Sequence, residues 1–402
     1  MNDLAIDQYD YPLPNERIAA HPLSRRDASR LLVYRDGVIT DSEFGRLPHF
    51  LTPGSRILLN DTRVIEARIF FTKETGGVIE LFCLEPYEPA EMNAALQAEG
   101  RVQWRCLVGG ASKWKPGLVL EKELTVGGDP VRLEARFISK EPEDFIIELR
   151  WNGPQHFAEI LHVAGNIPLP PYIKREAGAA DAERYQTIFA RQEGSVAAPT
   201  AALHFTPEVI AALAEREIRP RYITLNVGAG TFKPVKTDTI GGHVMHAENF
   251  TVSRDTLAAL RQQGPLVAVG TTTLRTLESL YWIGIKNKEG APFDGSLGQW
   301  EAYGLDGATS YADALAVLEA HLDATGATEL HCRTSLLIRP GYRFRSADAL
   351  VTNFHQPRST LLFLVAAFIG PGWEKVYKHA LDNDYRFLSY GDSSLLFRDR
   401  QS

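Results

Sequence analysis

Residues 266–279 read LVAVGTTTLRTLES, in which a short apolar run passes directly into a threonine-rich, helix-forming run. The apolar residues predict a buried strand, and 274–282 predict a helix that begins soon after it. A strand that passes through a short turn into a helix is typical of α/β proteins with a largely parallel sheet. Ligands of such sheets bind beyond the carboxyl ends of the strands. The stretch therefore predicts an α/β fold and marks its own turn as a candidate ligand site.

The turn itself offers groups that can bind an anion or a sugar. Thr271 and Thr272 carry hydroxyls, and Arg275 carries a positive charge. The N-terminus of the following helix adds free N–H groups and a positive partial charge. The alternative is structural: the threonines cap the helix, and Arg275 pairs with Glu278 one turn later.

After residue 153, strand-like and helix-like segments alternate. Examples are a strand at 221–227 and a helix at 360–368. This alternation predicts a larger unit of mixed α/β (α+β) class. The stretch 286–327 shows no clear pattern, and we expect it to be a connection.

Residues 71–152 have a different texture, in which apolar and polar residues alternate. Two examples are VIELFCL (78–84) and FIIELRW (145–151), with glycine turns between such runs. Several short alternating runs predict an all-β unit. We therefore expect a discontinuous α/β catalytic domain (1–70 and 153–402) into which a β domain (71–152) is inserted.

The composition excludes several classes of protein. The 402 residues are 44% hydrophobic and 23% charged, with a net charge of −7, which is typical of globular proteins. No apolar run approaches the roughly 18 residues of a membrane helix. Cys83, Cys106 and Cys332 are too few and too far apart for a disulfide framework or a structural zinc site. The N-terminus also lacks a signal pattern, so we expect a cytoplasmic protein with no membrane partner.

The segment HVMHAE contains His243, His246 and Glu248, whose spacing resembles a set of metal ligands. The preceding glycine, Gly242, argues against a helix that would bring the two histidines together. In a strand, only His246 and Glu248 would share a face. We therefore expect hydrogen bonding or general-base chemistry here rather than a metal; the structural alternative is a polar loop.

Two more histidines stand where elements begin or end. His204 precedes a helix N-cap, and His355 follows a strand. A histidine at the carboxyl end of a strand is a site candidate on geometry, although a structural role is the commoner one. The loop NVGAGTF (226–232) also follows a strand, and its glycines permit close approach to a ligand. It lacks the GxGxxG and P-loop patterns, so a structural turn is the alternative.

Nine strings of the chain, in order, match those of one known family. They are NDTRVIEAR (60–68), IPLPPYIKR (167–175), RYQTIFA (184–190), GSVAAPTAALHFT (194–206), VGAGTFKPV (227–235), HVMHAE (243–248), VGTTTLRTLES (269–279), TNFHQPRSTLL (352–362) and YRFLSYGD (385–392). By these strings the chain resembles the S-adenosylmethionine:tRNA ribosyltransferase-isomerases, a family of queuosine biosynthesis. The resemblance covers nearly the whole chain.

This resemblance implies a fold and an activity. The implied fold is an α/β domain that carries an inserted six-stranded antiparallel β-barrel. The implied enzyme transfers and isomerises the ribosyl moiety of S-adenosylmethionine onto 7-aminomethyl-7-deazaguanine at the tRNA wobble position. The products are epoxyqueuosine-tRNA, adenine and methionine. S-adenosylmethionine is thus a co-substrate, the partner is the anticodon arm of tRNA, and we expect a monomer without a metal.

Such a reaction needs a general base, a proton donor for adenine, and polar contacts to the ribose and the methionine carboxylate. The residues expected to act in catalysis are His204, His243, His246, Glu248 and His355. The residues expected to bind substrate are Thr200, Gly228, Gly230, Thr231, Thr271, Thr272, Arg275 and Asn353.

At four positions the chain differs from what the family commonly carries. Ala202 replaces a glycine, Asn226 replaces a histidine, and Gly242 and Ser335 each replace an acidic residue. The loss of histidine and carboxylate groups can change the base, the substrate or the rate. The alternatives are therefore a divergent paralogue that acts on another nucleoside and a protein that binds RNA without catalysis.

Overall fold

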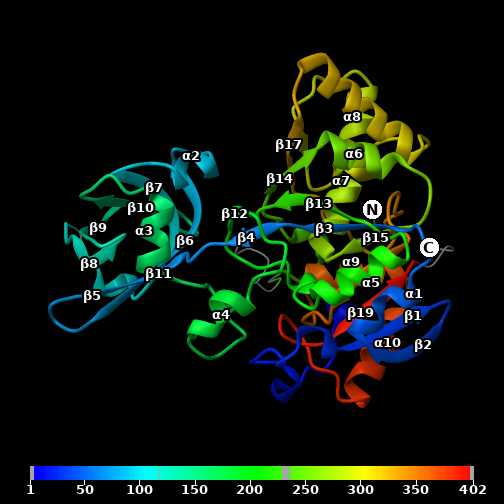
Figure 1. The fold of residues 1–402 in the computed structure, drawn as a ribbon, viewed down its shortest axis with the longest axis horizontal. Helices are drawn as coiled ribbons and strands as arrows, with labels where there is room; N and C mark the ends of the chain where they lie inside the picture. The colour runs from blue at the N-terminus through cyan, green and yellow to red at the C-terminus, as the bar shows by residue number, and fades with distance from the viewer. Residues whose placement is uncertain (1–3, 116, 229–234, 236, 399–402) are drawn as a thin grey trace.

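The computed structural model describes residues 4–115, 117–228, 235 and 237–398. Within these residues, a ten-stranded sheet with its helices forms a larger unit, and a seven-stranded sheet forms a smaller unit beside it (Figure 1). The order across the ten-stranded sheet is β16 (Ser296–Leu297), β17 (Glu329–Thr334), β14 (Glu248–Ser253), β13 (Pro220–Leu225), β3 (Arg56–Asn60), β15 (Leu266–Val269), β18 (Ala349–Asn353), β19 (Ser393–Phe397), β1 (Arg30–Arg35) and β2 (Val38–Glu43). A short parallel pair, β4 (Thr62–Val64) and β12 (Gln192–Ser195), lies where the two units meet.

The centre of the ten-stranded sheet is parallel. β3 pairs in parallel with β13 and β15, and β15 pairs in parallel with β18. β18 then pairs with β19 in the antiparallel sense, and β14 pairs antiparallel with β13 and β17. All residues of β15 and β18 are buried, as in strands that helices cover on both faces. The mixed α/β class predicted for this unit is confirmed.

Helices surround this sheet, and two of them begin close to the ends of its central strands. The helices are α1 (Leu47–Phe50), α4 (Ala179–Arg184), α5 (Pro207–Glu215), α6 (Arg254–Arg261), α7 (Thr271–Lys288), α8 (Tyr311–Thr325), α9 (Thr360–Ile369) and α10 (Gly372–Asp382). The predicted strand–helix joint is β15 followed by α7, with Gly270 between them at φ 93°, a conformation that favours glycine. Among the described residues, none of the helices is long and apolar enough to cross a membrane.

The smaller unit is an antiparallel sheet with two short helices. The order of its strands is β11 (Gly165–Asn166), β5 (Arg68–Thr72), β6 (Val78–Glu88), β7 (Arg101–Gly109), β10 (Phe145–Trp151), β9 (Asp129–Lys140) and β8 (Leu120–Val126). The helices are α2 (Met92–Leu96) and α3 (Phe157–Ala164). Side chains of α3 share one buried apolar cluster with the strands, and the helix packs inside the curl of the sheet (Figure 1).

The expected closed six-stranded barrel is wrong. In the described part of the chain the sheet has seven strands, because Gly165 and Asn166 add a strand after α3. No strand pairing among the described residues joins β8 to β5 or β11, so the sheet curls without closing. Lys122 of β8 instead donates to the carbonyl oxygens of Phe70 and Ala164, at 3.2 and 2.9 Å. The sequence hid the seventh strand because two residues are too few to show alternation.

Candidate active site

A cavity with about 850 Å³ of empty space lies at the carboxyl ends of β15 and β18. We call it the strand-end cavity. Thr271 and Thr272 contribute to it from the first turn of α7, and Asn353 and His355 from the end of β18 and the turn after it. Its position is the one that the joint at 266–279 predicts. The remaining walls are largely apolar and include Tyr172, Ala198, Phe354, Leu361 and Leu388.

A second cavity lies between the two units, and we call it the interunit cavity. The smaller unit contributes Leu84, Glu85, Leu107, Glu143 and Asp144, and the larger unit contributes Gly228, His243, Met245, His246, Ala247, Glu248, Arg275 and Arg333. Thr272, Thr360 and Leu361 line both cavities. The two cavities therefore meet where the first turns of α7 and α9 come together.

Arg275 does not pair with Glu278, so the structural alternative for the threonine turn is wrong in this respect. Arg275 forms an ion pair with Glu248, the first residue of β14, and both side chains are more than nine-tenths buried. Burial lowers the pKa of Arg275 to about 10, so it stays protonated at neutral pH. Glu278 instead accepts hydrogen bonds from the hydroxyl of Tyr342 at 2.8 Å and the backbone N–H of Ser346 at 2.9 Å.

His243 and His246 lie in the irregular segment before β14. His243 is partly buried and His246 is exposed. Burial, and to a smaller extent the neighbouring His246, lower the pKa of His243. Gln299 fixes this segment, because its amide donates to the carbonyl of His243 at 2.6 Å and accepts from the N–H of Met245 at 3.0 Å. The backbone at His243 is therefore fixed, and its imidazole is neutral and can accept a proton at neutral pH.

No described group of three or more His, Cys, Asp or Glu residues is arranged to hold a metal ion. Glu248 makes an ion pair with Arg275, as described above. What the segment HVMHAE brings together, among the described residues, is two imidazoles on the wall of the interunit cavity.

His355 lines the strand-end cavity and is held by two neighbours. Its Nε2 lies 2.8 Å from the hydroxyl of Thr352, and its backbone N–H donates to the hydroxyl of Tyr377 at 3.1 Å. Burial lowers the pKa of His355 to about 3, so its ring is neutral at physiological pH. It can exchange hydrogen bonds with a ligand but cannot be a cationic partner there.

The other predicted residues divide between the two cavities and the part of the chain that is not described. Thr200 and Asn353 line the strand-end cavity, together with Thr271 and Thr272. Gly228 lines the interunit cavity, while Gly230 and Thr231 lie outside the described residues.

His204 lines neither of the two cavities as the described residues define them. It is 6% exposed and lies behind Asn353.

The sequence did not single out the cavity walls that come from the smaller unit. Glu85 and Asp144 line the interunit cavity, and both lie near Arg105, at 3.4 and 3.3 Å. Arg333 lines the same cavity from β17. No local pattern could have found these residues, because they reach the site only through the contact between the two units.

The four positions that depart from the family pattern do not line either cavity, although Ala202, Asn226 and Gly242 each adjoin a residue that does. Ala202 is buried in the core, Gly242 is exposed, and none of the four, all of them described, lines either cavity. Asn226 accepts a hydrogen bond from the Thr62 hydroxyl at 3.1 Å. The departures therefore leave the described cavity walls intact.

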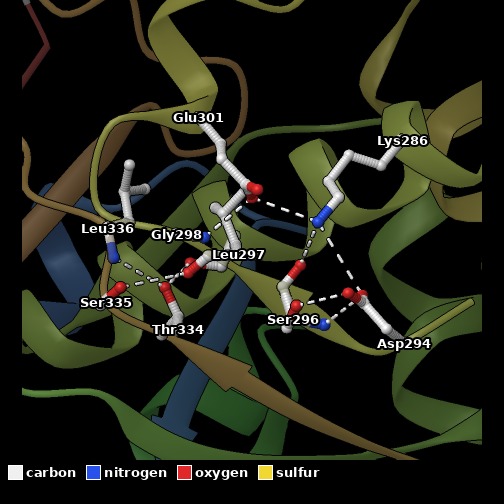
Figure 2. A network of polar contacts seen from close by, with 10 residues as sticks. Lys286, Asp294, Ser296, Leu297, Gly298, Glu301, Thr334, Ser335 and Leu336 are labelled. Atoms are coloured by element: carbon white, nitrogen blue, oxygen red, sulfur yellow. Dashed lines mark hydrogen bonds and ion pairs between the residues drawn. The ribbon is translucent and has the colours of Figure 1, made fainter. Parts of the chain in front are cut away.

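Ser335 belongs to a polar network beside β17 (Figure 2). Its backbone N–H donates to the carbonyl of Leu297 at 3.0 Å. Thr334 accepts from the N–H of Leu336 at 3.1 Å, and Lys286 holds the same loop through Glu301 at 3.1 Å. Position 335 thus helps to fix the loop before η9 (Glu301–Tyr303) against β17.

Known proteins resemble this chain over its whole length. The model of the queuosine biosynthesis protein family matches residues 6–396. A protein of Anaeromyxobacter sp. (strain Fw109-5) is 41% identical, with 98% of this chain and 99% of that protein covered. One from Azoarcus sp. (strain BH72) is 38% identical, with 98% of each covered. Both are named S-adenosylmethionine:tRNA ribosyltransferase-isomerase.

A solved structure is also similar to this chain. It is the crystal structure of S-adenosylmethionine tRNA ribosyltransferase from Thermotoga maritima, with 28% identity, coverage of 97% of this chain and 100% of that one, and a TM-score of 0.46. The family model and the curated relatives cover nearly every residue that forms the two cavities. The chain therefore belongs to the queuosine biosynthesis protein family.

Proposed function

We propose that this protein transfers and isomerises the ribosyl moiety of S-adenosylmethionine onto 7-aminomethyl-7-deazaguanine at the tRNA wobble position. The products are epoxyqueuosine-tRNA, adenine and methionine. Membership of the family and the names of the relatives support this activity. The observation that carries the proposal is that two cavities meet at Thr272. A transfer between two substrates needs two sites whose contents touch at one point.

We assign the adenosyl part of S-adenosylmethionine to the strand-end cavity. Tyr172 and Phe354 give it flat apolar walls that suit a purine, and the hydroxyls of Thr271 and Thr272 suit ribose. The N-terminus of α7 offers N–H groups and a positive partial charge to the methionine carboxylate. Gly230 and Thr231, in the glycine loop, remain proposed substrate contacts.

We assign the modified base of tRNA to the interunit cavity. This cavity has walls from both units, so a nucleotide that enters it lies between them. Arg333 on its wall is a cation that suits a phosphate. Arg275 carries a second positive charge, but its ion pair with Glu248 makes it a structural part of the wall.

The chemistry starts from the positive sulfonium, which acidifies the C5′ hydrogens beside it. A base that removes one of these protons starts the elimination of adenine; the aminomethyl nitrogen then attacks the opened sugar, and methionine leaves last. We propose His243 as the base, because a lowered pKa keeps it neutral and it lines the interunit cavity, which meets the cavity of S-adenosylmethionine at Thr272. His246 is the alternative base. We propose His355 as a hydrogen-bond partner of the departing adenine.

The organisation of the protein is part of this proposal. The sequence predicts an inserted domain at 71–152 within a catalytic domain of 1–70 and 153–402. Because β5, α3 and β11 belong to the smaller unit, we propose that the inserted domain spans about 68–166 and that the rest of the chain forms the catalytic domain. The anticodon arm of tRNA lies across both domains, since the base enters between them. We further propose that the protein is a cytoplasmic monomer and works without a metal.

Product release tests this function. The purified protein is incubated with S-adenosylmethionine and tRNA that carries 7-aminomethyl-7-deazaguanine, with unmodified tRNA as the control. Adenine and methionine are followed by chromatography, and the tRNA nucleoside by mass. The proposal predicts release only with the modified tRNA, together with the mass gain of the new nucleoside.

Other outcomes of the same assay favour the alternatives. Adenine release with a different modified tRNA, and none with this one, would identify a divergent paralogue. Binding of tRNA with no adenine release from any tRNA would identify a non-catalytic RNA-binding protein. None of the four departures lines either cavity as the described residues define them, and this favours catalysis over the second alternative.

A further inference from the structure

The amide of Asn353 has a fixed orientation at the wall of the strand-end cavity. Its Nδ2 lies 3.3 Å from the carbonyl oxygen of Leu388, which can only accept a hydrogen bond. Its Oδ1 accepts from the hydroxyl of Thr200 at 3.3 Å. Rotating the amide by half a turn would set Oδ1 against the Leu388 carbonyl, which is repulsive. The nitrogen therefore points to Leu388, and the oxygen points to Thr200.

His204 accepts a hydrogen bond from the second hydrogen of Asn353 Nδ2. Its Nε2 lies 3.3 Å from Nδ2 of Asn353. Burial lowers the pKa of His204 to about 4, so at neutral pH the ring has one donor nitrogen and one acceptor nitrogen. Because Nδ2 is a donor, Nε2 must be the acceptor, and the ring proton sits on Nδ1.

The hydroxyl oxygen of Ser29 accepts a hydrogen bond from this Nδ1–H. Its Oγ lies 2.9 Å from Nδ1 of His204, and Ser29, His204 and Asn353 are 2%, 6% and 3% exposed. The opposite tautomer would place an N–H of His204 against the N–H of Asn353. The chain of contacts from Ser29 to Thr200 is therefore consistent with one arrangement of hydrogens only.

We infer that Ser29 and His204 are positioning residues. They hold the side-chain amide of Asn353 so that its oxygen, Oδ1, is the atom that can bind a ligand. Both hydrogens of Nδ2 are engaged by described residues, and Oδ1 keeps one lone pair beyond the bond from Thr200. This wall of the cavity then selects a hydrogen-bond donor. On the adenosyl part of S-adenosylmethionine the donors are the exocyclic amine and the ribose hydroxyls. The inference rests on the proposed function for the identity of the ligand, whereas the arrangement of hydrogens is a property of the free protein.

The first test reads the tautomer directly. Protein labelled with ¹⁵N-histidine is studied by long-range proton–nitrogen correlation at pH 7, and the His204 signals are assigned by their loss in His204→Gln. We expect a neutral ring with its proton on Nδ1. A proton on Nε2, or a charged ring, would overturn the inference whatever the enzyme does.

The second test measures recognition by direct calorimetry. S-adenosylhomocysteine is compared with three analogues. S-inosylhomocysteine lacks the exocyclic amine, and 2′-deoxy- and 3′-deoxy-S-adenosylhomocysteine each lack one ribose hydroxyl. We expect the protein to bind one of these analogues about tenfold or more weakly, since an unpaired buried acceptor is costly. The analogue that is rejected identifies the donor. Equal affinity for all four compounds would overturn the acceptor role of Asn353.

The variants separate positioning from structural support. His204→Phe removes the acceptor for Nδ2, whereas His204→Gln keeps one within reach. The quantity compared is the ratio of the affinities for S-adenosylhomocysteine and for the rejected analogue. We expect His204→Phe and Ser29→Ala to reduce this ratio at least threefold, and His204→Gln to retain most of it. Ser139→Ala in β9 is the control and should leave the ratio unchanged. If His204→Phe does not fold, Ser29→Ala carries the test. Unchanged discrimination in folded His204→Phe or Ser29→Ala would contradict the positioning role.

Failure of the proposed function gives a different pattern. In that case the unaltered protein binds none of the four compounds and releases no adenine. The acceptor role of Asn353 toward adenosyl compounds then fails with it. The tautomer of His204 is still measured and decides the positioning role by itself.

Discussion

Arg275 in the second turn of α7 and Glu248 at the start of β14 form a buried ion pair on the wall of the interunit cavity. The pair joins the helix that follows the central strand β15 to an antiparallel strand on the flank of the sheet. It thereby fixes the segment with His243 and His246 relative to the first turn of α7. The geometry at the meeting point of the two cavities depends on this contact.

Breaking this pair on one side should destabilise the protein strongly. We expect Glu248→Gln and Arg275→Met each to lower the free energy of unfolding by about 3 kcal/mol, because each leaves one buried charge or polar group without its partner. Urea denaturation measures this. The double variant should lose less than the sum of the two single losses, and strictly additive losses would show that the two residues do not interact.

His243 should control the acid side of the activity profile. Its pKa is lowered, so the neutral base is present at pH 7 and is lost only below the usual histidine pKa of about 6.5. We expect kcat to be flat above that pH and to fall at lower pH. His243→Gln should lower kcat about 100-fold or more and remove this acid limb. If His246→Gln does so instead, the base has been assigned to the wrong histidine.

The two buried neutral histidines should make the fold less stable in acid. The pKa values of His204 and His355 are lowered to about 4 and about 3. The unfolded chain therefore binds protons below about pH 6.5 that the folded chain does not, so stability is lost as the pH falls. Between pH 6 and 4.5, replacing either histidine by Gln should reduce the slope of the free energy of unfolding against pH by up to about 1.4 kcal/mol per pH unit. An unchanged slope would mean that these histidines are protonated in the folded state.

Restoring the family residue at position 335 should change little. Ser335 lies in the network beside β17 and outside both cavities. We expect Ser335→Asp to alter kcat/KM less than about threefold, because position 335 lines neither cavity. Asn226→His serves as a second such variant. A tenfold rise in activity with either one would show that the departures do reach the site.

Lys122 should contribute to the stability of the smaller unit. It bridges β8 to the carbonyls of Phe70 and Ala164 across the gap that strand pairing leaves open. We expect Lys122→Met to lower the free energy of unfolding by about 1 kcal/mol, because two charge-assisted hydrogen bonds are lost and the Ala164 carbonyl stays partly buried. Lys140→Met, at the end of β9, is the matched control and should have no measurable effect.

The joint between β15 and α7 could be predicted because its signal is local. An apolar run, a glycine and a run of helix formers stand next to one another in 266–279, and the helix begins at Thr271, three residues before its predicted start. By contrast α8 lies within 286–327, where no pattern was seen. Ala314, Leu315 and Leu318 of this helix are buried, but alanines and charged residues blur its apolar stripe.

The candidate site could be predicted only in part. Thr271 and Thr272 were singled out because they stand at the carboxyl end of a strand, where the sheet geometry places ligands, whereas Asn353 stands in a string that carries the family resemblance. Histidine chemistry alone placed His204 in the site, although it lies behind the wall and contacts Asn353. The walls from the smaller unit could not be found, since the position of that unit against the larger one depends on contacts between residues far apart in sequence.

Two radioactive forms of S-adenosylmethionine test the central claim most directly. One carries ¹⁴C in the ribosyl carbons and the other in the methyl group, and each is incubated with tRNA that contains 7-aminomethyl-7-deazaguanine. The proposed function predicts that the ribosyl label enters tRNA with one adenine released per label, while the methyl label leaves in methionine. Methyl label in the tRNA, or adenine release without ribosyl label in the tRNA, would contradict it.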